Sequence, residues 1–195
     1  EHYGALPGNI VIAAGGDGTC NEVVNGLMKA AAKNNTEKPV FGILAIGRGN
    51  DFAYGAKVST VLGEDLLRIR DGKTALMDVG EVKGGDYPDG RYFGNGVGIG
   101  FDAIVGFEAA HMNHVHGGMA YTLGALKTLI KYPAAPELEI RYDEKELVLM
   151  PALVSVMNGR RMGGSFFMAP QGMMDDGLFD LCLTRQGPRR QLLGA

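Results

Sequence analysis

Two unbroken runs of apolar residues near the start of the chain each lead into a glycine-rich turn. They cover residues 8–14 and 39–47. Continuous runs of this kind, rich in isoleucine and valine, are typical of strands covered on both faces, as in a parallel sheet. Between them, Val24, Leu27 and Ala31 recur at helical spacing. The pattern predicts a strand–helix–strand unit with parallel strands and a right-handed crossover.

The limits and faces of two helices are also marked in the sequence. Thr19 precedes Glu22 by three residues. This is the spacing of a capping box, so Thr19 is expected to cap the first helix. A second helix is predicted over residues 60–70, with Leu62 and Leu66 on one face.

The pattern changes near residue 74, where short strands with turn signals replace the longer elements. Residues 137–143 alternate between polar and apolar, as a half-buried antiparallel strand does. One helix is expected in this region, over residues 118–132. The sequence therefore predicts an α/β domain over residues 1–75 and a mostly-β sandwich over residues 76–195.

The α/β part contains fewer strands than a stable doubly wound domain needs. Two parallel strands are expected there, whereas sheets usually hold ~4–6 strands. The chain also opens on Glu1 rather than methionine. The expectation is that both domains are truncated, the first at its N-terminal side and the second at its C-terminal side.

Composition narrows the function classes. The chain is 46% hydrophobic and 21% charged, which is typical of a globular protein with a real core. Its net charge of −3 argues against a nucleic-acid binder that works by bulk charge. Its two cysteines form no disulfide framework, which favours a reducing compartment. No apolar run reaches the ~18 residues of a membrane span.

Two glycine-aspartate loops stand at the ends of the two apolar runs. They are residues 15–19, GGDGT, and residues 47–51, GRGND. A strand-to-helix turn presents unpaired amides and the positive end of a helix, which favour a phosphate. The aspartate in the loop fits such a site if Mg²⁺ lies between its carboxylate and the phosphate. A lone GGDG is equally compatible with a tight turn, but two loops at the same edge of a parallel sheet favour a nucleotide site.

Five motifs follow one another along the chain: GGDGTCNEVVNGL, GRGNDFA, MDVGEV, YFGNGVGIGFDA and MAPQGMMDDGLFDL. With these motifs in this order, the chain resembles the bacterial diacylglycerol kinases and related lipid kinases along nearly its whole length. Sphingosine kinases are close relatives of that family, and NAD kinases and 6-phosphofructokinases share the GGDG loop more distantly. The resemblance implies an NAD kinase/phosphofructokinase-like nucleotide-binding domain followed by a lipid-substrate domain.

The resemblance also assigns roles to residues. It makes Asp17 and Asp78 the catalytic carboxylates of a water-bridged Mg²⁺ network, although Asp78 alone would read as a strand-edge carboxylate facing water. Arg48 stands where the family usually has a small hydroxyl residue. Its side chain is expected either to contact a phosphate or to point into solvent. The expected ATP-binding residues are Gly15, Gly16, Asp17, Gly18, Thr19, Asn21, Gly49, Asn50 and Asp51.

A second ion site is implied by the MMDDGLFD segment. The family's structural Mg²⁺ loop places the carboxylate of Asp176 with the carbonyls of Met173 and Leu178 as ligands, all oxygen donors that Mg²⁺ prefers. The other interpretation is a β-turn, because Asp-Gly between apolar residues is a strong turn signal. The two interpretations are compatible.

One expected residue is absent. The family's general base is a glutamate in a downstream Asp-Gly-Glu motif, and no Asp-Gly of this chain is followed by Glu. The base is therefore expected beyond residue 195, and these 195 residues alone are expected not to phosphorylate lipid at a useful rate.

Other polar residues keep two interpretations. Arg160 and Arg161 face either anionic phospholipid headgroups or solvent. His111, His114 and His116 form either a transition-metal site or a polar stretch.

The sequence thus predicts an ATP- and Mg²⁺-dependent kinase that phosphorylates a lipid hydroxyl, with diacylglycerol as substrate and phosphatidic acid as product. A sphingosine or other long-chain-base kinase, and a non-catalytic nucleotide- or lipid-binding regulator, are the alternatives. The expected partner is a lipid at a membrane surface and not a nucleic acid. The expected location is cytoplasmic, peripheral at the inner membrane face, and a homodimer is left open.

Overall fold

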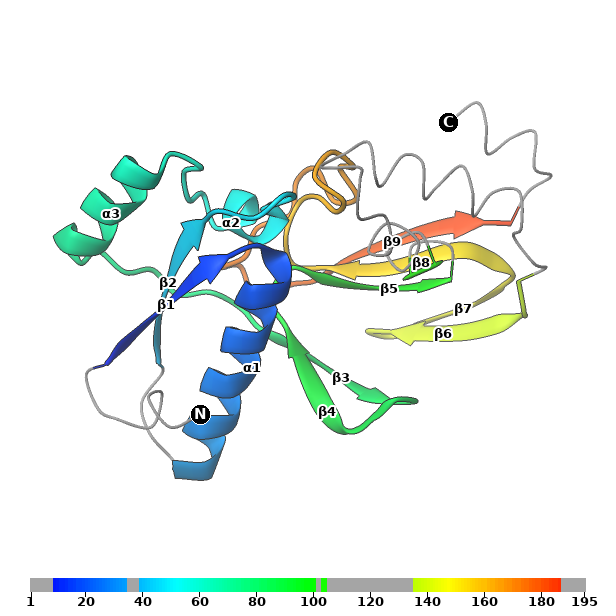
Figure 1. The fold of residues 1–195 in the computed structure, drawn as a ribbon. Helices are drawn as coiled ribbons and strands as arrows, with labels where there is room; N and C mark the ends of the chain where they lie inside the picture. The colour runs from blue at the N-terminus through cyan, green and yellow to red at the C-terminus, as the bar shows by residue number, and fades with distance from the viewer. Residues whose placement is uncertain (1–8, 35–38, 101–102, 105–134, 187–195) are drawn as a thin grey trace. The chain divides into compact units, whose positions relative to one another are not determined.

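The structure is a computed structural model, and it describes residues 9–34, 39–100, 103–104 and 135–186. These residues belong to two compact units (Figure 1). The first comprises Glu1–Gly96 and Met157–Phe179, and the second comprises Val97–Val156 and Asp180–Ala195. The expected domain boundary at residue 75 falls inside the first unit. It stays a prediction, because a compact unit is not by itself an independently folding domain.

The first unit is built on a strand–helix–strand motif. Strand β1 (Ile10–Gly15) and strand β2 (Val40–Ala45) pair in parallel, from Ile10 opposite Val40 to Gly15 opposite Ala45. Helix α1 (Asp17–Asn34) connects them. The predicted crossover unit is thus confirmed, and both loops after the strands lie at the same sheet edge.

Helix α1 begins three residues earlier than the capping box predicted, at Asp17 instead of at the residue after Thr19. Its first turn already includes Asp17, and the Cys20 amide donates to the Gly16 carbonyl at 3.0 Å. Thr19 therefore lies inside the helix, and Glu22 pairs with Arg91 on a neighbouring strand instead of capping. The prediction was wrong because the glycine turn lets the helix start directly after β1, where a side-chain cap has no place.

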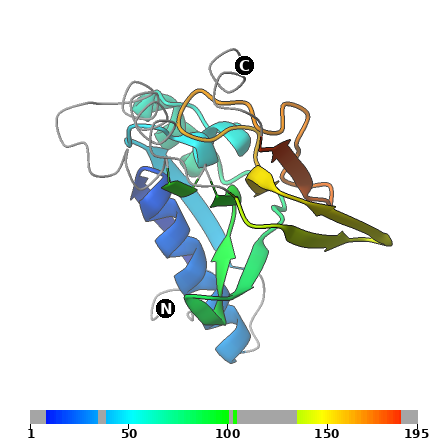
Figure 2. The same cartoon turned by 90° about the vertical axis from the view of Figure 1, so that its right-hand side faces the viewer.

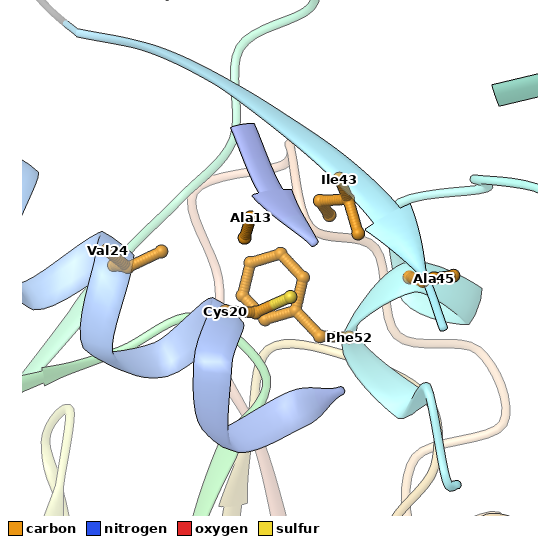
Figure 3. Packing of buried hydrophobic residues seen from close by; sticks show 7 residues of the cluster. Ala13, Cys20, Val24, Ile43, Ala45 and Phe52 are labelled. Atoms are coloured by element: carbon orange, nitrogen blue, oxygen red, sulfur yellow. The ribbon is translucent and has the colours of Figure 1, made fainter. Parts of the chain in front are cut away.

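The core of the first unit lies on one face of the parallel pair. Seven buried residues of β1, β2, α1 and the following short helix form this core, and the Phe52 ring is one of them (Figure 3). The opposite face of β1 is open among the described residues, since Ile10 and Ile12 are 52% and 42% exposed. The prediction that β1 is covered on both faces is therefore not met among the described residues. Its residues alternate between more and less buried, as in a strand with one face in the core.

Two shorter helices follow β2. Helix α2 spans Asp51–Gly55, and helix α3 spans Leu62–Asp71. The expected apolar face of α3 is solvent-facing, with Leu62 and Leu66 48% and 52% exposed. Asp65 is the buried residue instead, at 1% exposure, on a helix that packs against β2. The apolar spacing located the helix, but it did not identify the covered face.

An antiparallel hairpin completes the first unit beside α1 (Figure 2). It consists of β3 (Gly80–Gly84) and β4 (Tyr87–Phe93). Asn25 of α1 is buried and holds the hairpin at Tyr92. Its Nδ2 donates to the Tyr92 carbonyl at 2.8 Å, and its Oδ1 accepts from the Tyr92 amide at 2.9 Å.

The described part of the second unit is mostly strand, as the sequence predicted, with two helical residues at Ala103 and Ile104. A three-stranded sheet has the order β5 (Gly96–Gly100), β8 (Pro151–Met157), β9 (Asp180–Arg185). A separate antiparallel hairpin is formed by β6 (Leu138–Tyr142) and β7 (Lys145–Leu149). The helix expected over residues 118–132 lies outside the described residues. No helix in the described ranges has the length and apolar character that crossing a bilayer requires.

Candidate active site

The two glycine-aspartate loops touch through their backbones. A Cβ on Gly47 would stand 2.1 Å from the Cα of Gly16, which no real side chain tolerates. The Ile46 amide also donates to the Gly15 carbonyl at 3.2 Å. Glycine is therefore required where the loops meet, and the structure brings together the two motifs that the sequence placed at one sheet edge.

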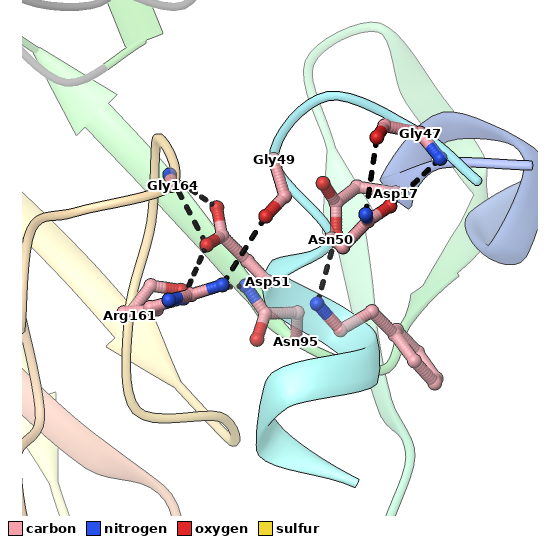
Figure 4. Close-up of polar contacts among 9 residues, drawn as sticks. Asp17, Gly47, Gly49, Asn50, Asp51, Asn95, Arg161 and Gly164 are labelled. Carbon is pink, nitrogen blue, oxygen red and sulfur yellow. Dashed lines mark hydrogen bonds and ion pairs between the residues drawn. The ribbon is translucent and has the colours of Figure 1, made fainter. Parts of the chain in front are cut away.

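Asn50 shapes the second loop. Its backbone is left-handed, with φ of 53°. Its side-chain Oδ1 accepts from the Gly47 amide and its Nδ2 donates to the Gly47 carbonyl, both at 3.0 Å. Asparagine tolerates this backbone region and closes such turns with its own side chain. Asn50 is thus fully used in fixing the loop (Figure 4).

Asp17 and Asp51 present their carboxylates on either side of Gly49. A Cβ on Gly49 would stand 2.9 Å from Asp17 Oδ2 and 3.5 Å from Asp51 Oδ2. The other oxygen of Asp17, Oδ1, accepts from the Phe52 amide at 2.8 Å, which fixes its orientation. The space that a side chain at position 49 would fill is therefore lined by two carboxylates.

Asp51 is held by Arg161, which lies far along the chain. Arg161 Nε is 2.8 Å from Asp51 Oδ1, and the Gly164 amide donates to Asp51 Oδ2 at 2.9 Å (Figure 4). Arg161 also donates to the Gly49 carbonyl at 3.2 Å, and its guanidinium lies 4.0 Å from the centre of the Tyr54 ring. Arg161 is thus neither a solvated turn residue nor a headgroup contact, the two interpretations that the sequence left open.

The site holds one buried carboxylate, Asp51, which pairs with Arg161, and one half-buried carboxylate, Asp17. Burial raises the pKa of Asp51, and the nearby charge of Asp17 raises it further, while the Gly164 amide and Arg161 oppose the shift. Burial likewise raises the pKa of the Cys20 thiol to about 11, with Asp17 again adding to the effect. A cation beside Asp17 would relieve this repulsion. The carboxylate oxygens around Gly49 are hard donors, so they fit Mg²⁺.

Asp78 is tied to the predicted ion loop. Its Oδ2 accepts from the Gly177 amide at 2.7 Å, and its own amide donates to the Met174 carbonyl at 2.6 Å. Asp176 Oδ1 accepts from the Leu178 amide at 3.0 Å, which closes a turn with Gly177 at φ of 75°. The carboxylate of Asp78 thus bonds to this turn, whereas that of Asp17 bonds to the Phe52 amide. The metal roles of Asp176, Met173 and Leu178 stay predictions.

The remaining candidates are less engaged in the site. Asn21 faces β4. With its side-chain amide oriented so that both its nitrogen and its oxygen have partners, the nitrogen lies 3.1 Å from the Tyr92 carbonyl oxygen. Arg48 is exposed and forms no ion pair within the described ranges. His111, His114 and His116 lie outside those ranges. The described residues contain no cluster of three or more His, Cys, Asp or Glu that could hold a metal ion.

The segment that carries Arg161 was not recognised as part of the site. Asn95 donates from Nδ2 to the Arg161 carbonyl at 3.0 Å and so positions this segment. Gly163 and Gly164 have φ of 64° and 80°, a conformation that glycine adopts without strain. The paired glycines after two arginines were the available signal, because they mark a backbone that approaches another chain segment closely.

Two family models match the chain. The model described as the diacylglycerol kinase catalytic domain matches residues 4–82. The model described as the YegS C-terminal NAD kinase beta sandwich-like domain matches residues 95–195, more than half of the chain. Together the two models cover both the glycine-aspartate loops and the strands of the second unit.

Individual proteins agree with these matches. The chain is 37% identical over 177 residues to a "probable lipid kinase YegS-like" from Chromohalobacter salexigens, covering 90% of this chain and 53% of that protein. It is 34% identical over 185 residues to the diacylglycerol kinase of Bacillus subtilis, covering 91% and 55%. A crystal structure of "a putative diacylglycerol kinase" from Bacillus anthracis has a TM-score of 0.71 at 25% identity, covering 96% and 59%. The chain spans about half the length of these curated relatives. It belongs to the diacylglycerol kinase catalytic-domain family, with an NAD kinase-like α/β part and a YegS-type β-sandwich-like part.

Proposed function

We propose that this chain carries the nucleotide site of a lipid kinase that transfers the γ-phosphate of ATP to the hydroxyl of diacylglycerol, giving phosphatidic acid. Family membership supports a lipid kinase in general. One observation supports the site: the carboxylates of Asp17 and Asp51 flank Gly49 where the loops after β1 and β2 meet. Ligands of open α/β sheets bind at this edge.

The residues of the chain divide the work. Amides at the start of α1 and the positive end of that helix bind phosphate oxygens. Asp17, with Asp78 as second carboxylate, would hold Mg²⁺. When bound, the ion neutralises charge on the transferring phosphoryl group. Arg161 and the Gly164 amide keep Asp51 in place without blocking the carboxylate of Asp17.

An amide substitution at Asp17 tests this assignment. Asp17→Asn keeps the acceptor for the Phe52 amide but removes the charge that holds Mg²⁺. In the protein that carries this chain, we expect ATP-dependent lipid phosphorylation to fall by at least ~100-fold, the loss usual for one electrostatic group in an active site. Asp86→Asn, at an exposed residue between β3 and β4, is the matched control. Unchanged phosphorylation by Asp17→Asn would refute the nucleotide-site assignment.

A panel of lipid acceptors decides among the alternatives. Diacylglycerol is expected to be phosphorylated faster than sphingosine or another long-chain base. The reverse order would favour a long-chain-base kinase. Binding of MgATP without phosphorylation of any lipid would favour a non-catalytic regulator.

The missing general base gives a second test. The residues after Asp17-Gly18, Asp71-Gly72, Asp89-Gly90 and Asp176-Gly177 are threonine, lysine, arginine and leucine. We therefore expect these 195 residues alone to bind MgADP in calorimetry but not to phosphorylate diacylglycerol, since a lipid hydroxyl needs a base. Robust turnover by the isolated chain would refute this expectation. We also propose peripheral attachment at the cytoplasmic face of the inner membrane, where the lipid acceptor resides.

A further inference from the structure

A cavity of about 410 Å³ in the first unit belongs neither to the GGDGT loop nor to the turn at Asp176. We call it the basic pocket. Its walls come from the end of α2, the connection to α3, the outer side of α3 and the segment after β8. The lining includes Tyr54, Lys57, Ser59, Glu64, Arg68 and Arg160.

Three cations line the basic pocket against one carboxylate, Glu64. Within the described residues, neither Lys57 nor Arg68 nor Arg160 lies within 4.0 Å of a carboxylate oxygen. Other basic side chains of the described chain, such as Arg91 and Arg161, do have such partners. The lining of the basic pocket therefore carries a net positive charge, which favours an anion.

Two of the three cations are held in position by backbone carbonyls. Arg68 donates from one terminal nitrogen to the Lys57 carbonyl at 2.7 Å, and Arg160 donates from Nε to the Gly172 carbonyl at 2.9 Å. A guanidinium carries five N–H donors in a fixed fork. Both arginines thus keep donors for a ligand, and the fork suits the oxygens of a phosphate group.

The rim of the basic pocket is aromatic. Tyr54 lines it and is 40% exposed, and its ring meets the ring of Phe167 edge to face at 6.0 Å between centroids. Phe167 itself is 53% exposed, and Phe166 beside it is 41% exposed. Exposed aromatic rings next to basic groups are the composition of a surface that contacts a bilayer interface.

We propose that the basic pocket binds the phosphate of an anionic phospholipid in a membrane surface, with Tyr54 and Phe167 against the interfacial region of the bilayer. The choice of a membrane rests on the proposed lipid kinase function, since the acceptor must be reached in a bilayer. The phosphate chemistry rests on the three cations alone. The basic pocket shares no lining residue with the carboxylates around Gly49, although Tyr54 at its rim contacts Arg161, the partner of Asp51. Those carboxylates repel an anion that lacks a metal ion.

Vesicle binding of the chain, measured without nucleotide, tests the proposal. The probes are phosphatidylcholine vesicles and phosphatidylcholine vesicles containing phosphatidylglycerol. The test variant is Lys57→Gln/Arg68→Gln/Arg160→Gln. The control variant Lys29→Gln/Lys33→Gln/Lys73→Gln removes the same charge from exposed positions of the same unit. At about fivefold per basic side chain near an anionic surface, we expect the test variant to bind on the order of a hundredfold more weakly to anionic vesicles.

The control variant should lose much less affinity, and neutral vesicles should bind weakly throughout. Equal losses by the two triple variants would overturn the proposal, because binding would then follow net charge alone. Equal binding of the unaltered chain to neutral and anionic vesicles would also overturn it.

A second pair of variants separates a membrane from free phosphate. Phe167→Ser is expected to weaken vesicle binding several-fold, and Leu76→Ser, at a side chain 71% exposed elsewhere, is the matched control. Inorganic phosphate in solution should compete only weakly. If Phe167→Ser matches its control and inorganic phosphate displaces the vesicles, the pocket is a site for soluble phosphate and the membrane proposal is wrong.

These outcomes are independent of catalysis. Failure of the protein that carries this chain to phosphorylate any lipid would refute the proposed function and leave the charge selectivity of vesicle binding intact. Failure of the vesicle comparison would refute the basic pocket and leave the nucleotide site intact.

Discussion

Arg161 and Asp51 form an ion pair that is largely removed from solvent. Their charged atoms are 2.8 Å apart, and their side chains are 17% and 7% exposed. Such a pair adds little net stability over an apolar pair, but loss of one partner leaves a buried charge without compensation. The pair also links the first residue of α2 to the segment that follows β8. It therefore matters for the shape of the candidate active site as well as for stability.

Removal of the cation should destabilise the first unit strongly. We expect Arg161→Gln to lower the free energy of unfolding by about 3 kcal/mol, because Asp51 keeps only the Gly164 amide as a close partner. Urea unfolding measures the change. Arg160→Gln is the neighbouring control, since Arg160 makes one hydrogen bond to a carbonyl and no ion pair among the described residues. A smaller loss for Arg161→Gln than for Arg160→Gln would contradict the buried-pair interpretation.

Asp51 should make stability depend on pH in an unusual direction. Its pKa in the folded chain lies above the ordinary 3.8, so the folded state keeps the proton to higher pH than the unfolded state. The stability that this proton contributes is present below the ordinary value and is lost as pH rises through the folded pKa.

The comparison of the unaltered chain with Asp51→Asn isolates this contribution. From about pH 4 upward, the unaltered chain should lose stability relative to the variant, by about 1.4 kcal/mol for each unit of pKa difference. Urea unfolding at several pH values gives the difference, with Asp86→Asn as an exposed control. A difference that grows in favour of the unaltered chain as pH rises would show that the folded pKa is lowered instead.

The contact between the glycine-aspartate loops should be intolerant of a methyl group. Gly47→Ala would place a Cβ against Gly16 and 2.7 Å from Asn50 Oδ1. We expect a loss of roughly 1–3 kcal/mol in stability and a large loss of MgADP affinity in calorimetry. Gly63→Ala in α3, where nothing lies within 4 Å of the added Cβ, should be neutral or slightly stabilising. Normal nucleotide affinity in Gly47→Ala would mean that the loops need not touch.

The two cysteines should differ in reactivity. Cys20 is 2% exposed, and burial followed by the charge of Asp17 raises its thiol pKa to about 11. Because the thiolate is the reactive form, native Cys20 should be alkylated by iodoacetamide far more slowly than Cys182 at mildly alkaline pH. Peptide mass spectrometry follows both sites in one sample, and urea should equalise them. Equal alkylation rates of Cys20 and Cys182 in the native chain would contradict the burial of Cys20.

The local parts of the fold could be predicted because apolar residues repeat along the sequence at the spacing of a strand or a helix. The apolar runs before Gly15 and Gly47, and the helical spacing between them, were enough to place β1, α1 and β2 in parallel order. The approach of the two loops followed from that order, because parallel strands end at one sheet edge. The family followed from five ordered motifs.

The parts that were missed depend on contacts between distant segments. Arg161 reaches Asp51 only because the segment after β8 returns to the first unit, and no local period encodes that return. The burial of Asp65 in place of Leu62 was missed for a similar reason, since the spacing of leucines does not say which face a neighbour covers. The start of α1 was misplaced because Thr19 has the residue type of a cap without the geometry of one.

Asn25 has a consequence for how the chain behaves in a crowded solution. By donating to one backbone group of Tyr92 and accepting from the other, its amide imitates the pairing of an adjacent strand. Strand β4 therefore offers no unpaired peptide group at that position to a strand of another molecule, and exposed strand edges are the usual templates of aggregation. The Asn25 side chain thus blocks the addition of a strand from another molecule at this position, and it also anchors the hairpin.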